Sequence, residues 1–396
     1  MIMTDASNIA RSTKRDWLRF WRDKCFTSSL LLFFFLLPLQ TRYIFSEASL
    51  YEWGTLSVYG VEALGWAVIL LFMGTWEHGS MGIKVKKCFL ASMLPCFLII
   101  WAFLSIVWAP DKMVALQSVI VLLEGILLFF VVLSYITPHP AFGHPLRGLR
   151  SLGPSSTPLG EGRVRGKMAG IVYAFLVGAT LQAGLGIYQF LTQSTFASSW
   201  LGMALHDPRA LGTSVIEFGN ERWLRAYGGL PHPNVFGGYL TVAFATTMMI
   251  WQKVSVKDSP WPRTILHIVM PILLTGIFFS FSRVAWLGAG LVMLAMLISE
   301  IKKCYTFARS SKSVAQSIWS LNVQYVIFIS LYLLFLVLLY RPLVTARIVS
   351  ESRLEIKSRV ERMEGVREAW TLIKKHPILG VGIGNYTQSV QQEVRP

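Results

Sequence analysis

The stretch Val114–Ile136, VALQSVIVLLEGILLFFVVLSYI, contains one charged side chain, Glu124, among mostly aliphatic and aromatic residues. Apolar runs of about 18 residues or more match the thickness of a bilayer core. Shorter or comparable apolar runs occur at Ser29–Leu39, Trp66–Met73, Cys88–Val107 and Val326–Tyr340. These runs do not alternate between apolar and polar residues, as the strands of a membrane barrel do. Because backbone polar groups in lipid must be satisfied within a helix or a closed barrel, the sequence predicts an all-α polytopic membrane protein.

Composition supports the same class. Of the 396 residues, 54% are hydrophobic and only 15% are charged, whereas soluble domains carry about 25% charged residues. This excludes a soluble enzyme, a disordered chain and a secreted disulfide scaffold. The net charge of +16 is interpreted as basic loops facing anionic lipid head groups, not as a nucleic-acid surface. The four cysteines show no metal-ligand spacing, so we expect no metal site.

About nine transmembrane helices are expected. The predicted spans are Ser28–Phe45, Thr55–Gly74, Cys88–Trp108, Val114–Ile136, Met168–Leu191, Val235–Trp251, Thr264–Phe281, Val284–Ser299 and Val323–Tyr340. Lys and Arg gather before the first span and after the second, fourth, sixth and eighth spans. Because positive residues mark cytoplasmic connections, we expect a multi-pass membrane protein with a cytoplasmic N-terminus.

This topology divides the chain into four predicted regions. Residues 1–27 form a basic cytoplasmic N-terminus. Residues 28–191 form an N-terminal transmembrane bundle with a flexible cytoplasmic loop at 137–167. Residues 192–340 form a core with an outer loop at 192–234 and a tight hairpin at Arg283. Residues 341–396 form an extracytoplasmic segment, in which apolar residues from Ile356 to Ile373 recur at the spacing of an amphipathic helix.

Arg283 is the strongest candidate for a residue that binds phosphate. It follows Phe281 and Ser282 in a very tight hairpin between two predicted spans. A guanidinium held at a span boundary offers a planar fork of donors that suits phosphate oxygens. The alternative is an arginine that reaches the interface only to solvate its own charge.

A second candidate is the outer stretch Arg225–Asn234, RAYGGLPHPN, which ends just before a span. Its glycines and prolines could position side chains over a cavity mouth, and His232 could shuttle a proton near neutral pH. The alternative is that the stretch caps the next helix, with Asn234 as the N-cap.

A third candidate is His376, in the stretch HPILGVGIGN that follows the amphipathic helix. A histidine at a helix C-terminus is favoured by the helix dipole, so a structural role is open as well. His376–Pro377 should end the helix, and the glycines at 380, 382 and 384 are interpreted as a backbone turn, not as a phosphate loop.

The chain resembles the O-antigen ligase and polymerase superfamily of bacterial envelope membrane proteins. Three features carry the resemblance, in this order: the Arg225–Asn234 stretch, the Phe-Ser-Arg283 hairpin followed by Trp286 and Gly288, and the stretch from Trp370 to Asn385. The resemblance runs from about residue 170 to residue 390. It implies a glycosyltransferase on the outer face of the inner membrane, which moves a glycan from undecaprenyl diphosphate to an acceptor lipid, glycan or protein, with no cofactor.

The resemblance also implies roles for residues. Arg225 and Arg283 would bind the diphosphate and act with His232 in catalysis, and Asn234 and His376 would help to bind substrate. The family pattern places its key histidine after the glycine-rich stretch, and the chain stops at Pro396 before such a motif, so we expect a truncated reading frame.

Other function classes stay open from the sequence. A protein O-oligosaccharyltransferase would use the same donor. A polysaccharide transporter would need paired polar groups near the membrane midplane, for which Glu62 and Glu124 are weak candidates. A non-catalytic membrane scaffold is the remaining class.

Overall fold

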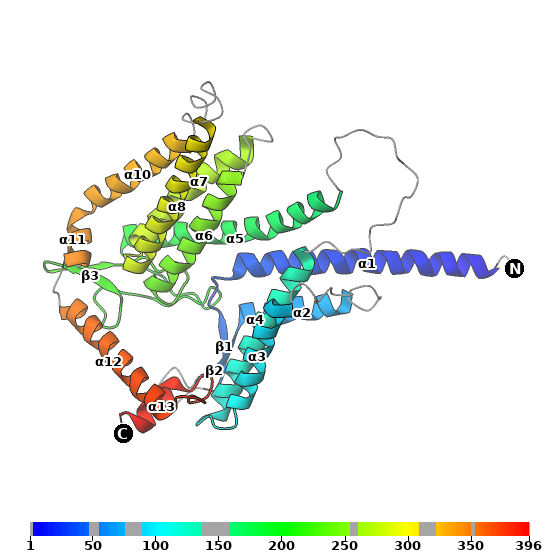
Figure 1. Ribbon diagram of the computed structural model, residues 1–396, viewed down its shortest axis with the longest axis horizontal. Helices are drawn as coiled ribbons and strands as arrows, with labels where there is room; N and C mark the ends of the chain where they lie inside the picture. The colour runs from blue at the N-terminus through cyan, green and yellow to red at the C-terminus, as the bar shows by residue number, and fades with distance from the viewer. Residues whose placement is uncertain are drawn as a thin grey trace. The chain divides into compact units, whose positions relative to one another are not determined.

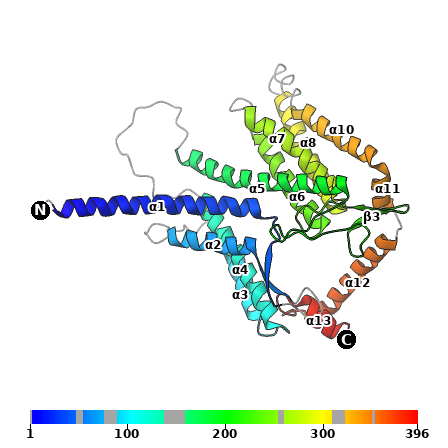
Figure 2. The same ribbon diagram turned by 180° about the vertical axis from the view of Figure 1, so that it is seen from behind.

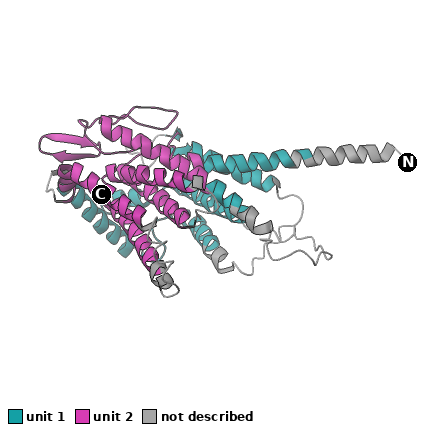
Figure 3. Cartoon of the chain, turned by 90° about the horizontal axis from the view of Figure 1, so that it is seen from above, with its two compact units in different colours: residues 1–34, 42–171, 356–396 teal, residues 35–41, 172–355 magenta. Residues whose placement is uncertain are grey.

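The computed structural model describes residues 3–46, 55–75, 89–136, 159–253, 260–308, 322–349 and 353–395. These residues are mostly helical and include two short antiparallel hairpins. The chain divides into two compact units (Figure 3). Unit 1 comprises residues 1–34, 42–171 and 356–396, and unit 2 comprises residues 35–41 and 172–355.

Unit 1 is built around a helical hairpin. Its elements are α1 (Met3–Leu36), β1 (Arg42–Ser46), β2 (Leu56–Tyr59), α2 (Gly60–Thr75), α3 (Phe89–Ser105), α4 (Lys112–Ile136), α12 (Arg353–Lys375) and α13 (Tyr386–Glu393). Helices α2 and α3 both pack against α4, and β1 pairs with β2. The side chain of Asp111 caps α4 by accepting hydrogen bonds from the backbone of Met113 and Val114.

The C-terminal glycine-rich stretch docks on the turn between α3 and α4 within this unit. The buried Asn385 side chain accepts a hydrogen bond from the Asp111 backbone N–H at 2.8 Å and donates to its carbonyl at 3.1 Å. The Ser105 hydroxyl accepts one from the Ile383 N–H at 3.1 Å. The backbone at 380, 382 and 384 is left-handed, which confirms the predicted turn.

Unit 2 is a helical bundle with a β-hairpin at one end. It contains α5 (Leu159–Thr192) from residue 172, β3 (Val215–Phe218), β4 (Glu221–Leu224), α6 (Pro233–Lys253), α7 (Pro260–Phe279), α8 (Arg283–Ala308), α10 (Asn322–Leu339) and α11 (Arg341–Val349). Helix α6 packs against α7 and α8, which lie side by side in both views (Figures 1 and 2). Helices α10 and α11 are bent by 84° relative to each other, and α11 packs against β3.

A helix lies at each predicted span, but the count of nine spans is not confirmed. Among the described residues, three helical segments are long and apolar enough to cross a membrane: Lys112–Ile136, Gly166–Thr192 and Arg283–Lys302. The bent pair α10 and α11 would make a fourth. Three further apolar helices are shorter: Gly60–Gly74, Pro95–Ser105 and Arg263–Phe279.

Two predicted boundaries are wrong. The span Ser28–Phe45 ends early, because α1 stops at Leu36 and the chain turns into β1 at Arg42. The span Thr55–Gly74 starts late, because Leu56–Tyr59 pairs with β1 as a strand. Apolar composition alone could not separate these strand residues from the helices beside them.

The predicted loop 137–167 lies mostly outside the described residues, and its last part, from Leu159, is already helical in α5. Helix α12 confirms the predicted amphipathic helix and ends at Lys375, just before His376 and Pro377. Several of its apolar residues are exposed, including Met363, Val366 and Trp370, whereas Leu372 is buried.

Candidate functional site

The loop that leads into α6 is buried, which is unusual for a connection. Every residue from Leu224 to Leu230 is buried. Two glutamines of α5, Gln182 and Gln189, hold its backbone. The Gln189 side-chain oxygen accepts hydrogen bonds from the N–H groups of Tyr227 at 3.2 Å and Gly228 at 2.8 Å, and its amide donates to the Gly228 carbonyl at 2.8 Å. Gln182 accepts from Gly229 at 2.6 Å. Buried backbone groups need such partners.

Gly228 is required at the centre of this loop. Its φ is +60°, a left-handed conformation that disfavours side chains. A Cβ atom there would lie 2.7 Å from the ring of Phe236 near the start of α6. The loop and the start of α6 therefore form one packed unit.

Arg225 ties this loop to the turn between α7 and α8. Its side chain is only 4% exposed. Its Nε donates to the Ser280 carbonyl at 2.8 Å, and its Nη2 donates to the Asn234 side-chain oxygen at 2.7 Å. The neighbouring Ala226 N–H donates to the Phe279 carbonyl at 3.0 Å. The guanidinium thus contacts both the α7–α8 turn and the first turn of α6.

The α7–α8 turn, residues 280–282, confirms the predicted tight hairpin. Phe281 is fully buried and has a φ of +45°, a strained conformation for a residue with a bulky side chain. Its ring packs against Phe278, Phe190 and Trp286. Arg283 is the first residue of α8 and is exposed, so the turn is rigid while its guanidinium reaches the surface.

Sequence reasoning missed a third arginine at this turn. Arg347 of α11 is 9% exposed, and its Nε donates to the Phe281 carbonyl at 2.9 Å. Arg225 and Arg347 therefore bind the carbonyls of consecutive residues, Ser280 and Phe281. Together they fix the backbone from which Arg283 projects.

The first turns of α6 and α8 lie next to each other at this point. A Cβ atom on Gly237 of α6 would lie 2.7 Å from the Ser280 hydroxyl and 2.8 Å from the Ala285 Cβ. Helix N-termini carry a partial positive charge. Two N-termini and three guanidinium groups make this end of unit 2 favourable for a multivalent anion.

His232 occupies the cap position of α6, with Pro233 as the first helical residue. Its Nδ1 accepts a hydrogen bond from the Asn234 N–H at 3.0 Å, so Nε2 carries the proton and donates to the Ser214 hydroxyl at 3.1 Å. Asn234 lies inside the first turn, so its prediction as the N-cap is wrong. The proton-shuttle role of His232 stays a prediction.

The loop at 192–234, which the sequence predicts to be an outer loop, is attached to this site through His206 and Ser214. The His206 ring stacks on Tyr227 with centroids 4.1 Å apart. The Tyr227 hydroxyl accepts a hydrogen bond from the Ser214 N–H at 2.7 Å. Burial lowers the pKa of His206 below its ordinary value, so the folded loop favours the neutral ring.

His376 belongs to unit 1. Its Nε2 lies 3.0 Å and 3.1 Å from the two carboxylate oxygens of Glu393 in α13, and Lys375 donates to the Glu393 carbonyl at 2.7 Å. These contacts join the end of α12 to α13. The predicted role of His376 in substrate binding stays a prediction.

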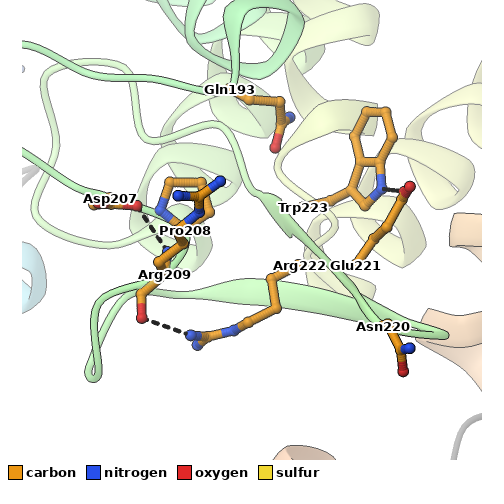
Figure 4. Close-up of a pocket in the computed structure, with 8 residues that line it drawn as sticks. All are labelled: Gln193, Asp207, Pro208, Arg209, Asn220, Glu221, Arg222 and Trp223. Carbon is orange, nitrogen blue, oxygen red and sulfur yellow. Dashed lines mark hydrogen bonds between the residues drawn. The ribbon is translucent and has the colours of Figure 1, made fainter.

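A polar hollow of about 540 Å³ lies in unit 2, among residues 207–209, the β3–β4 turn and β4 (Figure 4). Trp223 forms part of its lining and is two residues from Arg225.

Comparison with known proteins finds one family match. Residues 268–396, which include the α7–α8 turn, α11 and the glycine-rich stretch, match the model of the O-antigen ligase family. No curated protein and no solved structure matches the chain. Over residues 268–396, the resemblance to the O-antigen ligase superfamily is confirmed.

Proposed function

We propose that the chain is a membrane glycosyltransferase that moves a glycan from undecaprenyl diphosphate to an acceptor. The family match over residues 268–396 indicates membrane glycan transfer in general. Transfer from a diphosphate donor is supported by the two buried arginines, Arg225 and Arg347. They hold the α7–α8 turn, and the exposed Arg283 follows that turn directly. Such a guanidinium can bind phosphate oxygens at low reorganisation cost.

In the proposed reaction, an acceptor hydroxyl attacks the anomeric carbon of the glycan. The bond from that carbon to the diphosphate oxygen breaks, and the diphosphate leaves with its negative charge. Arg283, supported by Arg225 and by the N-termini of α6 and α8, stabilises this charge as it develops. The hydroxyl proton passes to Nδ1 of His232 after that atom gives up its hydrogen bond from the Asn234 N–H.

The proposal includes a location. The α7–α8 turn would face the outside of the bacterial inner membrane, with the N-terminus in the cytoplasm, because Lys and Arg concentrate on the opposite set of loops. The acceptor could be a lipid, a glycan or, in a protein O-oligosaccharyltransferase, a protein hydroxyl. A polysaccharide transporter or a membrane scaffold would not need Arg283 for a chemical step.

Replacement of Arg283 tests the proposal. The side chain is exposed, so Arg283→Ala should insert into membranes at the normal level yet lose glycan transfer. Arg283→Lys should also fail if the guanidinium binds phosphate through two parallel hydrogen bonds. Arg341→Ala is a matched control, because Arg341 is an exposed arginine at the start of α11.

Arg225→Ala should lose transfer as well, but this guanidinium also holds the α7–α8 turn. Its protein level and melting temperature must therefore be measured alongside transfer. Normal transfer by Arg283→Ala at a normal protein level would refute the proposed function.

A further inference from the structure

The polar hollow in unit 2 is lined by none of the arginines that the proposed reaction uses. Its lining includes the indole of Trp223 and the side chains of Gln193, Asp207, Arg209, Glu221 and Arg222. We infer that this hollow is a binding subsite for a pyranose unit of a glycan substrate. The inference rests on the proposed function and adds a place for the sugar.

The charges in the hollow argue against a phosphate ligand. Two guanidinium groups, Arg209 and Arg222, are matched by two carboxylates, Asp207 and Glu221. Arg222 lies in addition 3.8 Å from the carboxylate of Glu217. A lining with balanced charge gives an anion little net attraction. It does supply both donors and acceptors, which a ligand with several hydroxyl groups requires.

The lining is held in place before any ligand arrives. The Trp223 indole N–H donates to the Glu221 carboxylate at 2.9 Å, and Arg222 donates to the Arg209 carbonyl at 3.0 Å (Figure 4). The Gln193 side-chain oxygen accepts from the Leu224 N–H at 2.6 Å. Side chains fixed in this way lose less entropy on binding. The Trp223 ring packs against Phe190, with centroids 6.1 Å apart, and also lines the hollow. Aromatic surface at such a position suits the C–H face of a sugar ring.

The position of the hollow fits a glycan attached to a diphosphate. Trp223 is near the end of β4, and Arg225 follows two residues later. Two extended residues span about 7 Å. With a diphosphate near Arg225 and Arg283, the first sugars of the glycan, or the sugar that accepts it, would lie within reach of Trp223.

The test measures sugar binding directly, without glycan transfer. The full chain in lipid nanodiscs is mixed with methyl glycosides of glucose, galactose, mannose and N-acetylglucosamine, and saturation-transfer NMR reports which ring protons contact protein. At least one glycoside should bind to the wild type. Trp223→Ala should weaken its binding about tenfold, and Trp223→Phe should restore most of it.

Trp200→Ala is the matched control, because Trp200 is 88% exposed in the same outer loop and does not line the hollow. It should bind sugar like the wild type. Arg283→Ala should also keep sugar binding, and inorganic pyrophosphate should not displace the glycoside. Absence of binding by every glycoside, equal loss in Trp200→Ala and Trp223→Ala, or displacement by pyrophosphate would overturn the subsite.

Transfer kinetics then show whether the sugar in the hollow belongs to the donor glycan or to the acceptor. If the donor glycan occupies the hollow, Trp223→Ala should raise the KM for the lipid-linked donor about tenfold and leave the acceptor KM unchanged. If the acceptor occupies it, the pattern should be reversed. Unchanged values for both substrates would contradict the inference. Transfer at the wild-type rate by Arg283→Ala, with sugar binding intact, would instead contradict the proposed function.

Discussion

Arg347 offers the most informative single substitution, because its side chain is buried and its Nε donates a hydrogen bond to the turn that precedes Arg283. We predict that Arg347→Met, which keeps an unbranched stem about as long as the arginine chain to Nε and removes its donors, lowers the free energy of unfolding by about 1.5–3 kcal/mol. That range is the usual contribution of a hydrogen bond to a charged group, and it applies because Arg347 is 9% exposed and donates at 2.9 Å.

The larger effect should be on the rate of transfer. Without Arg347, the Phe281 carbonyl loses this donor, and the strained turn at φ +45° can relax and move Arg283. A displacement of about 1 Å in a group that contacts the reacting atoms can lower the rate about 100-fold. We therefore expect kcat to fall about 10- to 100-fold, with partial recovery in Arg347→Lys.

The assay combines thermal unfolding in detergent with transfer from a lipid diphosphate-linked glycan. Arg341→Met is the control, because this exposed arginine begins the same helix. It should leave both the melting temperature and kcat unchanged. If Arg347→Met folds and keeps wild-type kcat, the reasoning that Arg347 positions Arg283 is refuted.

Three further outcomes follow from the packing. Gly228→Ala should destabilise the protein by about 2 kcal/mol, because φ is +60° and the new Cβ would contact Phe236; an unchanged melting temperature would contradict this. Lowering the pH below about 6.5 should loosen the loop, because unfolding lets His206 take up a proton that its half-buried position against Tyr227 disfavours. Hydrogen exchange of residues 194–214 at pH 5.5 and 7.5 measures this, and His206→Phe should flatten the difference. Asn385→Ala should lower the free energy of unfolding by about 1–3 kcal/mol by removing two bonds to the α3–α4 turn; equal melting of mutant and wild type would contradict that role.

The sequence was most informative where the placing of apolar residues along the chain decides the local structure. Apolar runs on both sides of Ser282 predict a tight hairpin, and the apolar spacing from Ile356 predicts α12; both are present. The strand pairing at Arg42–Ser46 was not predictable, because it depends on a partner strand that reads as the start of a span.

The support of the site was harder to predict. Arg347 is 64 residues after Arg283 in the sequence, and only the bend between α10 and α11 brings it to the Phe281 carbonyl. One available signal was overlooked. Gln182 and Gln189 are polar residues seven apart within an apolar span, and polar residues in such spans usually face a partner. Here they hold the loop that contains Arg225.

The position of Arg283 relative to the membrane is the central claim, and cysteine labelling tests it most directly. Helix α8 carries Arg283 at its start and the native Cys304 near its end. At 1.5 Å per residue they are about 31 Å apart, close to the thickness of a bilayer core. The measurement uses intact spheroplasts, a membrane-impermeant maleimide and a chain with Arg283→Cys in which Cys25, Cys88 and Cys96 are serine.

We predict that residue 283 reacts from outside the cell, whereas Cys304 reacts only after the membrane is permeabilised. Labelling of Cys304 from outside, with residue 283 protected until permeabilisation, would place the arginines on the cytoplasmic side and contradict the account.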